Sequence, residues 1–346
     1  MVTLQQLLGV DLPIIQAPMA GLQDSALTVA VSNAGGLGSL PAAMLDLATL
    51  RSELQAITAQ TRRPYNVNFF CHTPPVPNAL HEARWREVLA PYYAEFGIDP
   101  ATIPAGSGRT PFTNDAADVL ESFRPPVVSF HFGLPAAPLL ARVKSWGSKI
   151  LSSATTVEEA LWLEARGVDA VIAQGLEAGG HRGLFLTNDL TTQVGTMALL
   201  PQVVRAVRVP VIASGGIADA QGVRAALSLG AAGVQLGTVY LLCLEATTSP
   251  LHRAALKSDR ARHTALTNLI TGRPARGIFN RLMRELGPLS DAPPDFPLAG
   301  AALAPLKAAA EKLGRDDFST LWSGQNTSGC REIPAAELTH LLAAQT

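Results

Sequence analysis

Residues 149–175 read KILSSATTVEEALWLEARGVDAVIAQG, and the unit contained in this stretch recurs along the chain. A short apolar run (149–154) precedes a helical pattern with an acidic start and Gly167 just past its end, and a second apolar run (170–175) follows. Two strands joined by a helix with such start and stop signals form a βαβ unit, whose strands pair in parallel. The stretch therefore predicts an α/β protein built on a parallel sheet.

Similar apolar runs, each followed by a turn and a helical pattern, occur from residue 13 onward. The runs are 13–19 (PIIQAPM), 37–40 (LGSL), 65–70 (YNVNFF), 127–132 (VVSFHF), 149–154 (KILSSA), 170–175 (AVIAQG), 209–214 (VPVIAS) and 233–238 (GVQLGT). Eight strands in about 230 residues is the number expected for a (β/α)8 TIM barrel. A doubly wound parallel sheet is the competing architecture.

Two long segments interrupt this regular spacing. Residues 73–122 form an insertion after the third predicted strand, and residues 176–200 form a long loop after the sixth. Extensions at the carboxyl ends of barrel strands commonly build the active site. Residues 241–346 contain helical segments, a proline-rich break at 291–297 and no convincing strand. We therefore expect a barrel over residues 1–240, with its insertion, and a mainly helical cap over 241–346.

The composition argues against several classes of protein. Lys plus Arg is 27 and Asp plus Glu is 28, and the net charge of -1 argues against nucleic acid or an anionic membrane as the main partner. No apolar stretch approaches the ~20 unbroken residues of a spanning helix, and the first residues lack the features of a signal peptide. Three cysteines without a C-x-x-C pair argue against a disulfide framework or a metal site. We expect a cytoplasmic protein, whose charged fraction of 16% leaves room for an apolar interface in a homo-oligomer.

Two glycine turns follow the last two predicted strands, SGGI at 214–217 and QLGT at 235–238. Glycine lets the backbone approach a ligand closely, and the loops after strands seven and eight of a barrel often hold a phosphate. The alternative is that these glycines only form tight βα turns.

Polar residues also lie on strand faces where a packed barrel interior would be apolar. Asn66 and Asn68 share one face of their strand, Ser129 and His131 share a face of the next, and Gln174 ends the sixth. Buried amides need hydrogen-bond partners, which a heteroaromatic ligand or an internal network would supply. We expect Asn68 and Gln174 to face a ligand, and Asn66 to belong to an internal network.

The loop after the sixth predicted strand, GLEAGGHRG at 175–183, places His181 among four glycines. Histidine is suited to acid–base chemistry near neutral pH, so we expect His181 to be functional. The histidines expected to be surface or satisfied residues are His72, His81, His252, His263 and His340. The chain has no Rossmann fingerprint, Walker lysine, H-E-x-x-H or G-x-S-x-G motif, so we expect a cofactor to supply the chemistry.

Taken together, these motifs resemble the nitronate monooxygenase family, formerly called 2-nitropropane dioxygenases, whose members are FMN-dependent TIM-barrel enzymes. The motifs are QAPMAG (16–21), GGLGSL (35–40), NVNFF (66–70), SFHFG (129–133), AQGLEAGGHRG (173–183), ASGGI (213–217), QLGT (235–238), TGRPARG (271–277) and WSGQ (322–325). The AQGLEAGGH segment also resembles FMN-dependent enoyl-acyl-carrier-protein reductases and NADH:quinone reductases. The SFHFG and WSGQ segments and the insertion favour the bacterial class that oxidises alkyl nitronates.

The resemblance implies roles for particular residues. His181 matches the family's active-site histidine, and His131 is a second histidine facing the same pocket. The residues expected to contact the isoalloxazine and ribityl parts of FMN are Ala17, Pro18, Met19, Asn68 and Gln174. Those expected to hold the ribityl chain and the phosphate are Gly179, Gly180, Ser214, Gly215, Gly216, Gln235, Leu236, Gly237 and Thr238.

By the family's chemistry, a nitronate of the propionate 3-nitronate type gives one electron to FMN, and O2 then yields a carbonyl compound and nitrite. His181 would either hold the anionic nitro group or act as a base toward a neutral nitroalkane. An NAD(P)H-dependent flavin reductase is the alternative on the same fold, and a flavin-free phosphosugar-binding barrel is a further one. Residues considered as determinants of substrate choice are Tyr65, Phe70, Phe132 and Arg182.

Overall fold

The computed structural model describes residues 2–103 and 109–344. Its main sheet has eight parallel strands in the order β1-β9-β8-β6-β5-β4-β3-β2. The strands are β1 (Ile14–Gln16), β2 (Gly38–Pro41), β3 (Tyr65–Phe70), β4 (Val127–His131), β5 (Lys149–Ala154), β6 (Ala170–Gln174), β8 (Val211–Ser214) and β9 (Gly233–Leu236). A parallel bridge between Ile15 and Leu37 joins the two end strands and closes the sheet into a (β/α)8 barrel. The predicted fold class is confirmed, and each predicted run overlaps one strand.

Both faces of the strands carry buried apolar residues, as parallel strands covered on both sides require. Val127 and Leu151 pack in a cluster with Leu4 and Leu8 of α1 (Leu4–Leu8), so this short helix fills one end of the barrel. The neighbouring residues on the strands, such as Val128, belong to the larger core shared with the surrounding helices. This alternation follows from the two-residue period of a strand.

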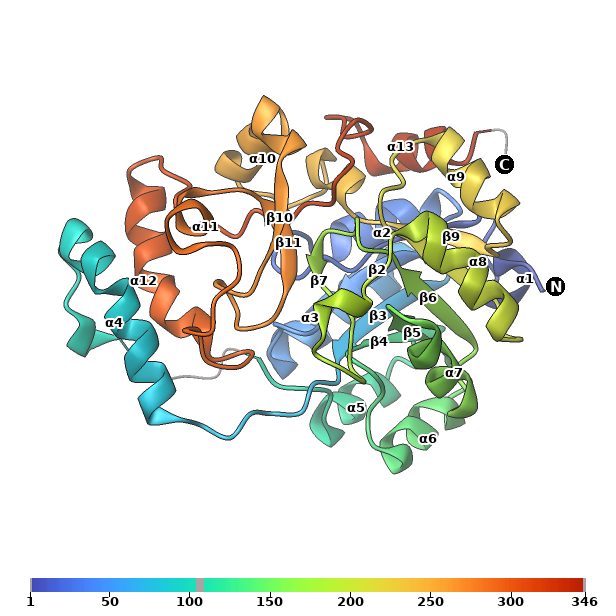
Figure 1. Cartoon of the computed structure of the whole chain (residues 1–346). Helices are drawn as coiled ribbons and strands as arrows, with labels where there is room; N and C mark the ends of the chain where they lie inside the picture. The colour runs from blue at the N-terminus through green and yellow to red at the C-terminus, as the bar shows by residue number, and fades with distance from the viewer. Residues whose placement is uncertain (1, 104–108, 345–346) are drawn as a thin grey trace.

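Helices surround the barrel between successive strands (Figure 1). They are α2 (Ser25–Asn33), α3 (Leu47–Gln60), α5 (Asn114–Glu121), α6 (Ala137–Ser145), α7 (Val157–Ala165), α8 (Thr196–Ala206) and α9 (Ala220–Ser228). The side chains of Thr156 and Asp219 cap the first turns of α7 and α9. Short 3-10 helices are η1 (Pro100–Thr102), η2 (Leu190–Thr192), η3 (Thr238–Leu242) and η4 (Asp259–Arg262).

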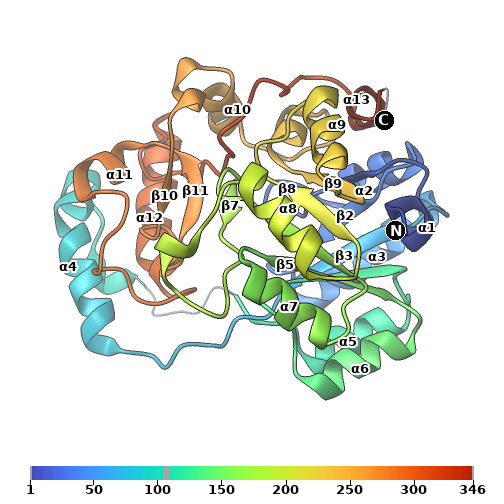
Figure 2. The same ribbon diagram turned by 45° about the vertical axis from the view of Figure 1, so that its right-hand side comes forward.

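A second core lies beside the barrel, where α4 (Ala79–Phe96) of the insertion packs on α12 (Ala299–Lys312) (Figures 1 and 2). The Trp85 indole N–H donates to the Ala299 carbonyl at 3.2 Å, and the Tyr93 hydroxyl donates to the Ala302 carbonyl at 2.7 Å. The insertion and the C-terminal region share one core although some 200 residues separate them in the sequence.

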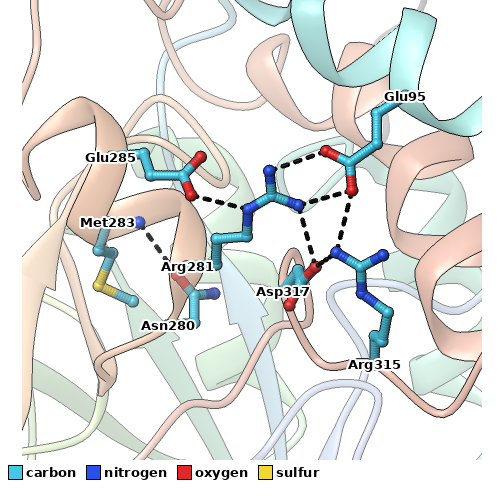
Figure 3. Close-up of polar contacts among 7 residues, drawn as sticks. All are labelled: Glu95, Asn280, Arg281, Met283, Glu285, Arg315 and Asp317. Carbon is cyan, nitrogen blue, oxygen red and sulfur yellow. Dashed lines mark hydrogen bonds and ion pairs between the residues drawn. The ribbon is translucent and has the colours of Figure 1, made fainter.

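Ion pairs add to this junction at the edge of the second core (Figure 3). Arg281, which begins α11 (Arg281–Leu286), donates to Glu95 of α4 at 2.8 Å and to Asp317 at 3.3 Å. Arg315 donates to Glu95 at 3.0 Å as well. The two arginines lower the pKa of the Glu95 carboxyl to about 2, mainly through the hydrogen bond from Arg281.

The region after residue 240 contains a β-hairpin, so the prediction that it has no strand was wrong. Strands β10 (Thr264–Thr267) and β11 (Ala275–Ile278) pair antiparallel, and β11 also pairs with β7 (Gly180–His181). These strands are short, carry small or polar residues, and enclose a turn containing Gly272 and a proline. Their pairing depends on a distant loop of the barrel, which a local apolar pattern does not reveal.

The remaining helices are α10 (Pro250–Leu256) and α13 (Ala335–Leu342), and the latter returns to pack on α2 and α9. Within residues 2–103 and 109–344, no helix is both long enough and apolar enough to cross a membrane. The same residues contain no cluster of three or more His, Cys, Asp or Glu side chains that could hold a metal ion.

Candidate active site

One pocket lies where the barrel strands end, between the barrel and the C-terminal region. All residues predicted for the site line it, from six strands of the barrel or the turns after them and from the loop after β6. They are His131, His181, Ala17, Pro18, Met19, Asn68, Gln174, Gly179, Gly180, Ser214, Gly215, Gly216, Gln235, Leu236, Gly237 and Thr238. The structure thus brings together motifs that lie more than 200 residues apart in the chain.

The glycine turns after β8 and β9 present free N–H groups to the pocket wall. The N–H groups of Gly215, Gly216 and Gly237 donate to no other group of the described chain. Gly215 and Gly216 have φ angles of 118° and 73°, a region that favours glycine, and a Cβ at Gly215 would lie 3.1 Å from the backbone nitrogen of Ala178. Adjacent N–H groups in such a turn form a concave site for an anion.

Two amide side chains have different surroundings. The Gln235 side-chain oxygen is buried and has no hydrogen-bond partner within the described residues, so the pocket contains an acceptor that a ligand could satisfy. Gln174, in contrast, donates to the His181 carbonyl at 3.0 Å and accepts from the Gly183 N–H at 2.7 Å. Both ends of its amide therefore hold the loop that carries His181.

The asparagines of β3 confirm the expected internal network. The Asn66 amide donates to the hydroxyls of Ser39 at 3.0 Å and Ser129 at 2.8 Å, and Asn66 itself does not line the pocket. Asn68 donates to the Ser129 hydroxyl at 2.9 Å and also lines the pocket. Asn66 is structural, whereas Asn68 has an amide at the pocket surface.

The His181 ring is held in a defined tautomer. Its Nε2 lies 2.9 Å from the Thr271 hydroxyl, and that hydroxyl donates its single hydrogen to the Arg273 carbonyl at 3.3 Å. With the hydroxyl donating to that carbonyl, its oxygen accepts from His181, and a proton on Nε2 leaves the Nδ1 lone pair free. Burial, followed by the positive charge of Arg109, lowers the pKa of His181 well below 6.5. The imidazole is neutral near neutral pH.

His131 uses both ring nitrogens within the protein. Its Nε2 lies 3.3 Å from the His181 carbonyl oxygen, which can only accept, so Nε2–H donates there. Its Nδ1 then accepts from the Ser153 hydroxyl at 3.0 Å. Burial lowers the pKa of His131 to about 3. Together with Gln174, His131 fixes the backbone at His181.

Two suggested determinants of substrate choice lie elsewhere. Tyr65 begins β3, at the opposite end of the strand from the pocket, and packs in the main core. Arg182 is fully buried, and its guanidinium donates to the Gln193 side chain at 3.0 Å and to two backbone carbonyls of the same loop. It supports the loop and does not line the pocket. Phe70 lines the pocket, and Phe132 packs 6.0 Å from the His181 ring.

One histidine departs from its expected setting. His72 was expected to be exposed or satisfied, yet it is buried, and neither ring nitrogen has a partner of good hydrogen-bond geometry in the described chain. Burial lowers its pKa to about 4. Its ring packs edge-on against Phe296 at 4.8 Å, within an aromatic cluster beside the pocket. His252 fits the expectation in part, because its Nε2 bonds the Trp322 carbonyl at 3.1 Å while Nδ1 has no described partner.

The sequence analysis missed residues on the side of the pocket away from the barrel. Arg109 of the insertion and Trp322 line the pocket, Thr271 bonds His181, and Phe296 packs 5.3 Å from the His181 ring. Thr271 and Trp322 are the first residues of the motifs TGRPARG and WSGQ, which carried the family resemblance but assigned no role to either residue. Arg109 and Phe296 had no such signal.

Comparison with known proteins agrees with this arrangement. Residues 2–345 match the sequence model of the family described as nitronate monooxygenase. The chain belongs to the nitronate monooxygenase family. It is 42% identical over 340 residues to a nitronate monooxygenase from Pseudomonas aeruginosa, with 97% of each chain covered. It is 44% identical over 336 residues to one from Paraburkholderia phytofirmans, covering 96% of this chain and 91% of the relative.

A solved structure of nitroalkane oxidase from Streptomyces ansochromogenes has the same fold as this member of the nitronate monooxygenase family. The two share 39% identity with a TM-score of 0.89, covering 99% of this chain and 97% of the other. The chain is thus an enzyme of the oxidoreductase class, in a family whose members are generally flavin-dependent.

Proposed function

We propose that this enzyme binds FMN and uses O2 to convert alkyl nitronates into carbonyl compounds and nitrite. The observation that carries the proposal is the convergence on one pocket of free backbone N–H groups in glycine turns and a neutral histidine with a free lone pair. The first can hold a phosphate without a basic side chain, and the second can exchange a proton with a small substrate.

The described residues fit FMN at several points. The N–H groups of Gly215, Gly216 and Gly237 would hold the phosphate, and the unpartnered Gln235 oxygen would accept a hydrogen bond from the cofactor. The other residues proposed to line its binding site are Ala17, Pro18, Met19, Asn68, Gln174, Gly179, Gly180, Ser214, Leu236 and Thr238. One-electron oxidation of the nitronate is the chemistry that bound FMN supplies.

His181 then has one of the two roles left open by the sequence. Because its pKa is lowered by burial and by Arg109, it carries no charge with which to hold an anionic nitro group. Its Nδ1 lone pair can take the proton from the carbon next to the nitro group of a neutral nitroalkane, which leaves the nitronate and a protonated imidazole. Thr271 accepts from Nε2 throughout and keeps Nδ1 available. His131 acts in this proposal as a positioning residue, because both of its nitrogens are engaged.

Two measurements test the proposal. The purified protein should show flavin absorption bands, directly or after addition of FMN, and the absence of such bands would refute it. Under anaerobic conditions, propionate 3-nitronate should bleach those bands rapidly while NADH should not. Rapid reduction by NADH, with none by the nitronate, would instead show the NAD(P)H-dependent reductase that the same fold supports.

A further inference from the structure

Arg109 is a half-buried arginine at the pocket whose guanidinium has no hydrogen-bond or ion-pair partner in the described part of the chain. It lines the pocket, and its Nη1 atom is buried. Burial lowers its pKa, and no carboxylate acts on it. An uncompensated buried cation is costly, which points to an anion that is bound from solution.

Arg273 provides the comparison, because it is also half-buried near His181 but has internal partners. Its guanidinium donates to the Leu184 carbonyl and stacks 4.1 Å above the Phe132 ring. The negative charge of Glu159 offsets part of the burial of Arg273, whose pKa is lowered to about 10. The described lining of the pocket includes Arg109 but neither Asp nor Glu, so Arg109 faces the ligand space as a cation without a counter-ion.

Arg109 lies beside an aromatic cluster at the pocket. Its guanidinium carbon is 5.5 Å from the centre of the Phe296 ring, and Phe296 packs with Phe70 and Phe132 in a small apolar cluster. Within this cluster, which we call the aromatic wall, Phe70 lines the pocket and offers an apolar surface against which short methylene chains could pack, with Phe132 and Phe296 packed behind it. The positive charge at its edge is suited to a planar carboxylate.

We infer that Arg109 binds a carboxylate at the far end of the substrate and makes the enzyme selective for short nitronates that carry one. The inference rests on the proposed function, since the nitronate end must lie at His181 and the cofactor. The aromatic wall would contact the carbon chain, and Arg109 would hold the terminal carboxylate through charge-assisted hydrogen bonds. It is a specificity-determining residue supplied by the insertion after β3.

The test compares two nitronates of matched skeleton, propionate 3-nitronate and propyl-1-nitronate, in which a methyl group replaces the carboxylate. Arg109→Met should raise KM for propionate 3-nitronate about 10- to 100-fold, the range expected for a lost hydrogen bond to a charged group, and change propyl-1-nitronate turnover less than about twofold. Arg109→Lys should keep part of the preference. Arg84→Met, which removes an exposed arginine of the same insertion, is the matched control and should change neither substrate.

Equal losses on both nitronates would overturn the inference, since Arg109 would then act on the nitronate end or on the shape of the pocket. No loss on either would overturn it too. Loss of FMN from Arg109→Met would assign the arginine to the cofactor. If that variant does not fold, Arg109→Lys decides, because loss of its preference for the carboxylated substrate would contradict the inference.

Calorimetric binding of 3-nitropropionate and 1-nitropropane separates this inference from the proposed function. The wild-type enzyme should bind the acid more tightly, and Arg109→Met should remove that difference. This result would support the role of Arg109 even if neither nitronate were turned over, an outcome that would refute the proposed function. Equal affinity of the wild type for the two compounds would overturn the inference.

Discussion

Replacing Thr271 with valine removes the partner of His181 with little change in shape. In the wild type, the His181 Nε2–H donates to the Thr271 hydroxyl at 2.9 Å. Valine cannot accept that hydrogen bond, so the proton on Nε2 is left without its partner. Alternatively, the proton moves to Nδ1 and occupies the lone pair that would act on the substrate. Either outcome reduces the fraction of enzyme in which His181 can act as a base.

The size of the effect follows from that single bond. A buried donor left without a partner costs about 1–3 kcal/mol, which corresponds to a fall of about 5- to 150-fold in kcat/KM if the cost falls on the reacting state. We expect the larger losses with a neutral nitroalkane, which must lose a proton, and smaller losses with its preformed nitronate. Packing should be nearly unchanged, because valine fills the same volume as threonine.

Oxygen consumption, measured at equal FMN content with nitroethane and with ethyl nitronate, provides the assay. Thr271→Ser retains the hydroxyl and should restore most of the activity toward nitroethane. If Thr271→Val keeps nitroethane turnover within about twofold of the wild type, the bond does not set the tautomer and the assignment of His181 as a base is wrong.

Other substitutions test the rest of the site and its support. His181→Asn should retain the bound flavin spectrum and lose most turnover of neutral nitroalkanes, and unchanged turnover would make His181 structural. Gly179→Ala would place a Cβ 2.5 Å from the Gly324 nitrogen, so we expect weaker FMN retention and about 1–3 kcal/mol lower stability, measured by flavin release and thermal melting. Arg182→Met removes the guanidinium that donates to the Gln174 and Gly175 carbonyls and should lower the free energy of unfolding in urea by about 2–5 kcal/mol, whereas a loss below about 0.5 kcal/mol would contradict its supporting role. Burial lowers the pKa of His252 to about 4, so the unfolded chain takes up this proton at a higher pH than the folded chain does. Stability should therefore fall as the pH drops from about 6.5 to about 4. His252→Gln should flatten that part of the plot of melting temperature against pH, and an unchanged slope would show that His252 does not contribute.

The barrel and its side of the pocket could be predicted because their signals are local. Each strand is a short apolar run with a turn after it, and the turns contain the glycines themselves, such as Gly215 and Gly216. Parallel strands of a closed barrel all end at the same rim, so motifs that follow different strands must lie close together. The alternation of Asn66 and Asn68 with apolar neighbours likewise identified an inward face before any contact was known.

The other side of the pocket depends on long-range pairing, and the sequence therefore predicted it poorly. Thr271 contacts His181 because β11 of the hairpin pairs with β7. No periodic pattern within residues 264–278 predicts that pairing. Phe296 reaches the same place from a proline-rich segment that was interpreted only as a break. The tautomer of His181 is set by these distant residues, so its role could not be chosen from its own motif.

Net charge and pocket charge are separate properties, and this chain shows the difference. The 27 basic and 28 acidic residues give a net charge that describes the chain as a whole. This net charge argues only against extended anionic partners such as nucleic acid or an anionic membrane. Within the pocket, the described lining contains free N–H groups at the glycine turns and the guanidinium of Arg109. It contains no carboxylate. A phosphate held by backbone groups leaves the single lining arginine for a second anion. Selectivity for an anionic substrate would then arise from where one cation is placed, in a protein that is close to neutral overall.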